Sequence, residues 1–347
     1  MLHHITLAAP LVFAAIGVDA SHATASTTAS WVEPLLQQVV TGLSNGMIIA
    51  LIAIGYTMVY GIIELINFAH GDLCTLGAFL ALTIAGTLGI EAWSGFGGFH
   101  GVVILLVAAA VFCGGLNWSI DYLVYRPLRN APKLTLLVSA IGCSFILVNV
   151  ALFWGGLPMG VFGGGVAAAA PKDFPALVSD VNVLPESWGV SFTKSDLLVV
   201  CVTIPLMVAL TLLVRYTRLG TAMRAVAQNP TAASLMGIDV NRVIGSTFLI
   251  GGALGGFASV IYALYNNTIS FQMGYRTGMD AFTAAVLGGI GSMPGAMVGG
   301  VVIGVVRALS DGYLEARWTN SVVFGILIVT LVFRPSGLLG AKLRDKV

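Results

Sequence analysis

Eight stretches of the chain are long, apolar and free of Asp, Glu, Lys and Arg. A charge near the centre of a bilayer is costly, and a crossing helix needs about 17–25 mostly apolar residues. The over-long fourth stretch divides at Gly155-Gly156-Leu157-Pro158, so its span should end near Trp154. We predict an all-α, polytopic integral membrane helical bundle with about eight transmembrane helices. The stretches are 34–63, 73–90, 92–120, 134–171, 197–214, 243–275, 281–306 and 318–333.

Basic residues mark one side of the predicted bundle, because short loops rich in Lys and Arg tend to remain cytoplasmic. Eleven of the sixteen Lys and Arg residues fall in three segments, which are 126–133, 215–242 and 334–347. The loops 157–194 and 266–280 should then be extracytoplasmic. Because three crossings precede the first basic segment, we expect the first span to start outside and the C-terminus to be cytoplasmic.

This charge placement conflicts with a single crossing in 281–306, since the basic tail would then lie outside. The segment from Leu287 to Gly295 reads LGGIGSMPG, and such a run cannot form an ordinary helix interior. We therefore predict that 281–306 forms two short elements, a glycine-rich broken or re-entrant pair. Glycines at 291, 295 and 299, like Gly42 and Gly46, are spaced for close approach of a neighbouring helix.

The first 30 residues differ from the rest. The apolar run from Leu7 to Val18 is too short for a good span, and Ala20-Ser21-His22-Ala23 suits signal peptidase. The positive region that should precede it is weak, with only His3 and His4. We predict either a cleaved signal peptide or an additional N-terminal segment in 1–30, followed by one transmembrane domain in 31–347.

Composition excludes several classes of protein. Only 9% of the 347 residues are charged, against about 25% in a typical soluble domain, which excludes a soluble enzyme. The net charge of +1 gives no basic field for nucleic acid. The 43 glycines are spread through apolar segments, which favours close helix packing. The four cysteines lie in predicted spans without Cys-x-x-Cys spacing, which is typical of small apolar residues rather than of metal ligands.

Two signatures of catalysis are missing from the sequence. No histidine pair beyond the N-terminal segment is spaced for a metal, and no glycine-rich run ends in Gly-Lys-Ser/Thr. We therefore expect no catalytic residue, metal or cofactor. If the chain moves a solute uphill, the energy must come from an ion gradient or from another subunit.

A polar segment lies between the first two apolar stretches. Glu64, Asn67 and His70 are spaced to lie roughly along one helical face, and Asp72 follows. Ionisable groups at membrane depth usually line an aqueous path and have a partner. The segment is either part of a solute path or a hydrogen-bonded cluster that fixes a helix break. The same ambiguity holds near the span ends for Asp121, Asp280 and Arg307.

The loop 215–242 predicts a short helix. Asn229 suits the N-cap, Pro230 the first helical position and Gly237 the end. Its apolar side would either enter a groove on a cytosolic protein or lie on the lipid interface. That side comprises Ala232, Leu235 and Met236.

Three segments, in order, resemble the H-type permeases of branched-chain amino acid ABC importers. They are ALIAIGYTMVYGIIELINFAHGD at 50–72, AFTAAVLGGIGSMPGA at 281–296 and RPSGLLG at 334–340. The resemblance covers most of 35–340. It implies a half-permease in a bacterial inner membrane, with 31–347 as the permease domain. It also implies a second, M-type permease, two cytosolic ATP-binding subunits that hydrolyse ATP, and an extracytoplasmic binding protein that delivers leucine, isoleucine or valine.

ABC permeases carry a Glu-Ala-Ala-x-x-x-Gly core in a cytoplasmic coupling loop. Residues 232–237, Ala-Ala-Ser-Leu-Met-Gly, are similar to its last six positions, whereas Thr231 stands in place of the glutamate. The resemblance therefore assigns 228–238 to ATPase coupling, which would bias inward-open against outward-open states. The residues so assigned are Asn229, Pro230, Thr231, Ala232, Ala233, Leu235, Met236 and Gly237.

A polar midplane with exposed helix termini suits a zwitterionic amino acid, because a half-helix N-terminus can meet a carboxylate. Two alternatives stay open. Permeases for urea or short-chain amides are similar around Asn-x-Ala-His-Gly, although GGIGSMPG favours the amino-acid branch. A stand-alone secondary transporter or channel would use Glu64 and Asp72 for ion coupling. The translocation-path hypothesis comprises Glu64, Asn67, His70, Asp72, Gly288, Gly291 and Pro294.

Overall fold

The computed structural model describes residues 32–64, 67–90, 96–165, 167–179, 181–185 and 189–340, and the predicted N-terminal segment 1–30 lies outside them. Within this part of the chain, eight helices are long and apolar enough to cross a membrane, which confirms the predicted bundle. Seven of the spans are α3 Val32–Ile63, α4 Ala69–Leu88, α7 Lys133–Gly155, α8 Lys194–Tyr216, α11 Val240–Asn266, α13 Met293–Tyr313 and α14 Ala316–Phe333. The remaining one joins α5 Phe96–Ile120, a π-helix Asp121–Tyr125 and α6 Arg126–Leu128.

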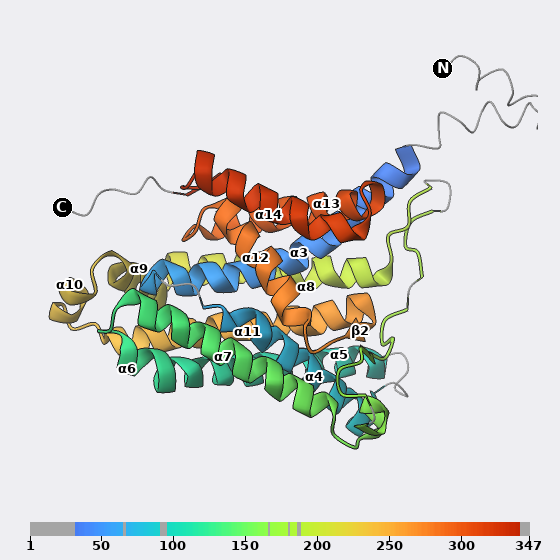
Figure 1. The fold of residues 1–347 in the computed structure, drawn as a ribbon, viewed down its shortest axis with the longest axis horizontal. Helices are drawn as coiled ribbons and strands as arrows, with labels where there is room; N and C mark the ends of the chain where they lie inside the picture. Colours follow the sequence, from blue (N-terminus) through green and yellow to red (C-terminus); the bar gives the residue numbers. More distant parts are fainter. Residues whose placement is uncertain are drawn as a thin grey trace, which may run out of the picture.

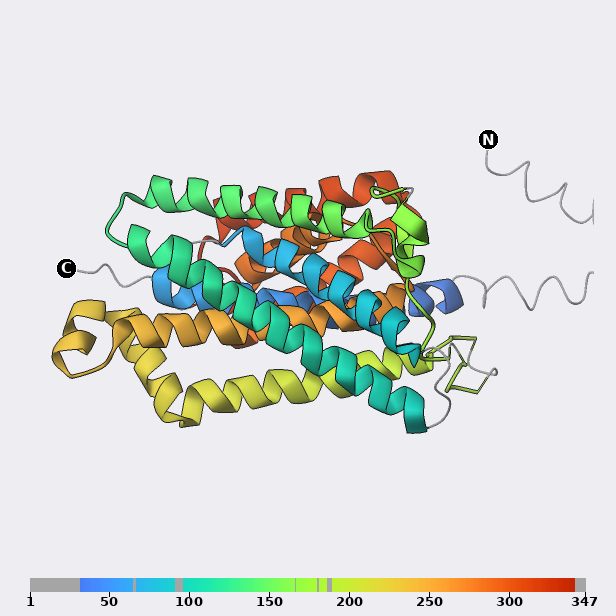
Figure 2. The ribbon, with the colours of Figure 1, turned by 90° about the horizontal axis from the view of Figure 1, so that it is seen from below.

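The bundle has two distinct ends (Figures 1 and 2). One end carries α9 Arg218–Gln228 and α10 Pro230–Leu235, together with the last turn of α14, and we call it the α10 end. The opposite end carries a two-stranded sheet, in which β1 Lys172–Asp173 pairs antiparallel with β2 Thr268–Ile269, and we call it the β2 end.

The third span is longer than predicted. Asp121 was expected to end it, but helical structure continues to Leu128. The Asp121 carboxylate is almost fully buried and lies 2.7 Å from the Arg129 guanidinium. Because the partner offsets the cost of burying the charge, Asp121 can remain within the helical run.

The region 281–306 is broken where predicted, but its elements are not confined to that range. Helix α12, Met273–Gly288, begins eight residues earlier, and α13 continues to Tyr313. Helix α12 runs from the β2 end towards the α10 end, α13 runs back and α14 returns (Figure 1). These three passes place the end of α14 at the same end of the bundle as α9 and α10, which removes the conflict in the charge pattern.

Glycines form the seam between α3 and α13. A Cβ atom added at Gly304 would lie 2.2 Å from the Cα of Gly46, and one at Gly300 would lie 2.4 Å from the Cα of Ala50. Lipid tails are as apolar as leucine side chains, so helices in a membrane gain most from close backbone approach. The predicted role of Gly42 and Gly46 as packing positions is confirmed. The same prediction is wrong for Gly291, where an added Cβ atom would meet no atom within 4 Å.

The long connection between α7 and α8 is a folded structure. The Lys172 side chain is buried, and its Nζ atom donates hydrogen bonds to the carbonyls of Phe162, at 3.0 Å, and Ala167, at 2.7 Å. The adjacent strand pairing attaches this connection to the turn between α11 and α12. The β2 end is therefore held together by contacts between segments distant in sequence.

The glycine seam between α3 and α13 predicts different effects on stability for two glycine-to-leucine substitutions. Gly304→Leu should lower the thermal unfolding midpoint of the detergent-purified protein strongly, because overpacking typically costs about 1–3 kcal/mol or more. Gly142→Leu on α7 should have little effect, since a Cβ atom there meets no atom within 4 Å. Midpoints can be measured by size-exclusion chromatography of heated samples, and equal midpoints would contradict the seam.

Candidate functional site

Asn67 belongs to a buried hydrogen-bonded cluster. Its amide nitrogen donates to Asn117 Oδ1 at 3.3 Å, and its amide oxygen accepts from the Tyr125 hydroxyl at 2.9 Å. Asn117 Nδ2 donates in turn to the carbonyl of Phe248 at 2.7 Å. The cluster joins the break after α3 to the third span and to α11, so these polar groups satisfy one another.

His70 lies in a gap that glycine provides. Its ring meets the Tyr56 ring edge-on, with centroids 4.8 Å apart, and a Cβ atom at Gly55 would be 2.4 Å from His70 Nε2. The side chain is fully buried, and neither ring nitrogen has a hydrogen-bond partner among the described residues. Asp72, also buried, accepts a hydrogen bond from the Ser144 hydroxyl of α7.

The predicted common helical face of Glu64, Asn67 and His70 is wrong. Helix α3 ends at Ile63, and α4 begins only at Ala69, so the first two residues lie between helices. Glu64 has a positive φ of 53°, and its half-exposed carboxylate is 3.7 Å from Lys133 Nζ. The structure therefore brings Asn67, His70 and Asp72 into the interior and leaves Glu64 at the surface; their role on a solute path stays a prediction.

The glycine break is stabilised by the segment after α14. Gly289 and Gly291 have φ values of 108° and 92°. The amides of Leu338 and Leu339 donate to the carbonyls of Leu287, at 2.8 Å, and Gly288, at 2.9 Å. Carbonyls at the end of α12, which have no partner within their helix, are thus satisfied by distant backbone.

The second half of the break begins a new helix. The Ser292 side chain accepts a hydrogen bond from the Gly295 amide at 3.2 Å, and Pro294 occupies the first turn of α13. A cavity of about 110 Å³ lies beside it, with Gly291 and Met293 on one side and Met223 and Arg224 of α9 on another. The break is therefore next to the helical loop at the α10 end.

The predicted helix in the loop 215–242 is confirmed as α10. Asn229 Oδ1 accepts from the Ala232 amide at 3.0 Å, Pro230 begins the helix, and Gly237 follows it with a φ of 83°. Ala233 is buried against the rest of the chain. The large apolar side chains of Leu235 and Met236 are 84% and 83% exposed. Helix α10 itself projects from the rest of the bundle in Figure 1.

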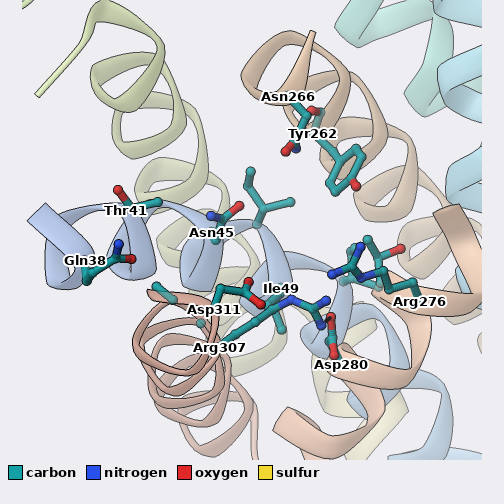
Figure 3. Close-up of a pocket in the computed structure, with 15 residues that line it drawn as sticks. Gln38, Thr41, Asn45, Ile49, Tyr262, Asn266, Arg276, Asp280, Arg307 and Asp311 are labelled. Carbon is teal, nitrogen blue, oxygen red and sulfur yellow. Dashed lines mark hydrogen bonds and ion pairs between the residues drawn. The ribbon is translucent and has the colours of Figure 1, made fainter. Parts of the chain in front are cut away.

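A cavity of about 220 Å³ lies between α3, α11, α12 and α13 (Figure 3), and its lining includes the last turn of α11, which leads into β2. Asp280 of α12 and Arg307 of α13 form an ion pair in its wall, and both side chains are nearly buried. Arg276 and Asp311 are the other charged residues that line it. Ile48, Ile49 and Ile52 of α3 give an apolar wall, and the remaining polar lining comprises Gln38, Thr41, Asn45, Tyr262, Asn266 and Thr277.

This cavity was not predicted as a site. Asp280 and Arg307 were recognised only as charges near span ends, and Arg276 was not singled out. One signal could have found the pair: these two charges bound the apolar stretch 281–306. Once the break folds that stretch into a hairpin, opposite charges at its two ends can meet.

Ser44 is not a catalytic nucleophile, although Gly42-Leu43-Ser44-Asn45-Gly46 has Gly-x-Ser-x-Gly spacing. That motif acts at a sharp strand-to-helix turn. Here the segment lies within α3, and the Ser44 hydroxyl donates to Asp196 Oδ1 at 2.6 Å.

These features define a class of protein. The chain is a multi-pass helical membrane protein with a cavity lined by charged residues and, at the opposite end, a capped helical loop. The chain belongs to the family described as branched-chain amino acid transport system / permease component, whose model matches residues 38–332. It is therefore a transport permease subunit.

Individual relatives match over nearly their whole length. The high-affinity branched-chain amino acid transport system permease protein LivH of Escherichia coli is 41% identical over 318 residues, which cover 90% of this chain and 97% of the relative. BraD of Pseudomonas aeruginosa, with the same description, is 39% identical and covers 90% and 98%. The probable permease LivM of Methanocaldococcus jannaschii is 30% identical over 36% of this chain and 41% of its own length. No solved structure matches the chain.

The buried cluster predicts that two asparagine-to-alanine substitutions have different effects on thermal stability. Asn117→Ala should lower the thermal midpoint, because it leaves the Phe248 carbonyl and the Asn67 amide unsatisfied, at a cost of about 1–3 kcal/mol. Asn149→Ala should be nearly neutral, since among the described residues that exposed amide bonds only to the carbonyl of Phe145 in its own helix. A smaller shift for Asn117→Ala than for Asn149→Ala would show that the cluster is not stabilising.

Proposed function

We propose that the chain forms half of the translocation path of an ATP-driven, high-affinity importer of leucine, isoleucine and valine. The observation that carries this proposal is 41% identity to the Escherichia coli relative across 97% of that protein, whose description names this transport. The other parts of the importer are a second, M-type permease, two cytosolic ATP-binding subunits and an extracytoplasmic amino-acid-binding protein. The partial match to a LivM permease supports a pair of related permease subunits.

ATP is hydrolysed by the partner subunits in this proposal. The sequence has no glycine-rich run ending in Gly-Lys-Ser/Thr with which to bind the phosphates itself. The chain supplies a path, and nucleotide binding elsewhere changes which side of the membrane that path faces.

The α10 end faces the cytoplasm of a bacterial cell, and the protein lies in the inner membrane. Arg126, Arg129 and Lys133 and the arginines of 215–242 gather at this end, as expected for cytoplasmic loops (Figures 1 and 2). The permease domain, 31–347, then starts outside and ends in the cytoplasm, and 157–194 is extracytoplasmic.

Coupling to the ATP-binding subunits runs through α10. Leu235 and Met236 project from the bundle, and an apolar groove on a partner would bury them. Thr231 is exposed in the first turn, where it replaces the family's glutamate. The preceding helix α9 lines the small cavity beside Gly291, so movement of the loop can reach the glycine break. We place Gly288, Gly291 and Pro294 in the inner half of the path on this ground.

Reconstitution tests the proposal. In proteoliposomes that contain both permeases and the ATP-binding subunits, leucine uptake should require ATP and the binding protein. The chain alone should give no flux down an ion gradient. Gradient-driven flux by the chain alone would favour a secondary transporter, and ATP-driven uptake of urea or short amides without leucine would favour the amide branch.

If α10 binds in an apolar groove of an ATP-binding subunit, a charge introduced on its exposed apolar side should disrupt coupling. In the same complex, Leu235→Asp should abolish the stimulation of ATP hydrolysis by the loaded binding protein, because a carboxylate cannot be buried in an apolar groove. The protein should still insert and purify, since the side chain is 84% exposed. Leu134→Asp is the matched control, because this leucine is 68% exposed in the first turn of α7 at the same end. Normal stimulation in Leu235→Asp would remove the coupling assignment.

A further inference from the structure

We propose that the cavity between α3, α11, α12 and α13 recognises a zwitterionic α-amino acid with a branched aliphatic side chain. Arg276 and Arg307 meet the carboxylate, Asp280 and Asp311 meet the ammonium group, and the isoleucines of α3 meet the side chain. The inference rests on the proposed function for the identity of the solute, and it adds where that solute is recognised and by which groups.

The charges of the cavity balance. Two guanidinium groups and two carboxylates line it, so its formal charge is zero. A zwitterion leaves that balance intact, whereas a cation or an anion would add an uncompensated charge beside nearly buried groups. A neutral amide would bring no charge to interact with the nearly buried Asp280 and Arg307 or with the exposed Arg276 and Asp311. The set therefore favours a solute with one positive and one negative end.

Donors remain available in this set. Arg307 is held by Asp280, yet its Nη2 atom is buried without a hydrogen-bond partner in the described part of the chain. Arg276, which is exposed, makes neither a hydrogen bond nor an ion pair with another described residue. A carboxylate accepts bonds from guanidinium groups in a fixed planar geometry, so it can use the Nη2 of Arg307 and the guanidinium of Arg276, neither of which has a hydrogen-bond partner among the described residues.

The lining from α3 suits an aliphatic side chain. Ile48, Ile49 and Ile52 line the cavity together with the charged residues of α12 and α13, and Figure 3 shows Ile49 close to Arg307 and Asp311. At about 220 Å³ the cavity is smaller than the roughly 300–1,000 Å³ of pockets for drug-sized ligands. It can accept one small molecule with a charged end and an apolar end.

The place of the cavity also fits an early position on the path. Its lining includes Tyr262 and Asn266 at the end of α11, which leads into β2, so the cavity lies nearer the β2 end than the glycine break does. The β2 end is extracytoplasmic in the proposed orientation, so a delivered solute would meet the cavity before the break. Asp280 and Arg307 lie on the two helices that flank that break. A solute bound in the cavity would therefore contact the Asp280–Arg307 ion pair, which joins α12 to α13 at this end.

Thiol protection tests the site directly. Asn45→Cys, in a Cys201→Ser background that removes the exposed native cysteine, places a thiol in the cavity of the reconstituted complex without binding protein. Modification by a small thiol reagent is followed by the mass of this chain. L-Leucine should slow modification, whereas leucinamide and 4-methylpentanoate, which each lack one charge, should not. Alanine, which keeps both charges, should protect only at higher concentration.

Substitutions of two arginines, one inside and one outside the cavity lining, test whether the cavity binds leucine. Arg276→Gln should raise the half-protecting concentration of leucine roughly tenfold or more, the usual effect of losing a hydrogen bond between charged groups. Arg317→Gln should leave it unchanged, because Arg317 is exposed on α14 outside the cavity lining. Thr268→Cys on β2 should show no protection by leucine, since it lies outside the cavity.

Equal protection by leucine, leucinamide and 4-methylpentanoate would overturn recognition of a zwitterion. No protection by leucine, in a complex that still imports leucine with ATP, would overturn the site and leave the proposed function standing. Absence of leucine uptake by the complete wild-type complex would overturn the function itself, and with it the identity of the solute.

Discussion

Backbone groups inside a membrane must find partners within the protein, and the break between α12 and α13 satisfies this constraint through the amides of Leu338 and Leu339. The rest of the architecture depends on that solution. Because α12 can stop at Gly288, α13 can run back against it and bring Arg307 to Asp280. The same turn adds the extra pass that returns α14 to the α10 end. Topology, ion pair and cavity therefore share one local cause.

The glycines have two different functions in this fold, and their surroundings separate them. Gly46 and Gly304 face each other so closely that any side chain would displace a helix backbone. Gly291 has open space around it and a φ of 92°, so it is needed for its conformation rather than its size. Rigid contact between α3 and α13 thus lies beside a turn that only glycine adopts easily. A permease needs both, because one part must stay fixed while another changes shape.

Much of the bundle was predictable, because charge-free stretches report directly on the cost of charge in lipid. The first span was placed within two residues of Val32–Ile63, and the end of α7 at Gly155 followed from the glycine and proline run. Predictions failed where tertiary partners change that cost: Asp121 continues a helix because Arg129 pairs with it. The cavity was beyond reach for a related reason. Its lining comes from four helices, and periodicity tells which face of a helix is apolar but not which helices meet.

The bonds from Leu338 and Leu339 also impose an order on biogenesis. The carbonyls of Leu287 and Gly288 leave the ribosome about fifty residues before the amides that satisfy them. Until Leu338 and Leu339 have been synthesised, these two carbonyls at the turn between α12 and α13 lack their native partners. Helices α12 and α13 can therefore insert first, but the turn between them reaches its native pairing only after α14 and the segment that follows it have been made.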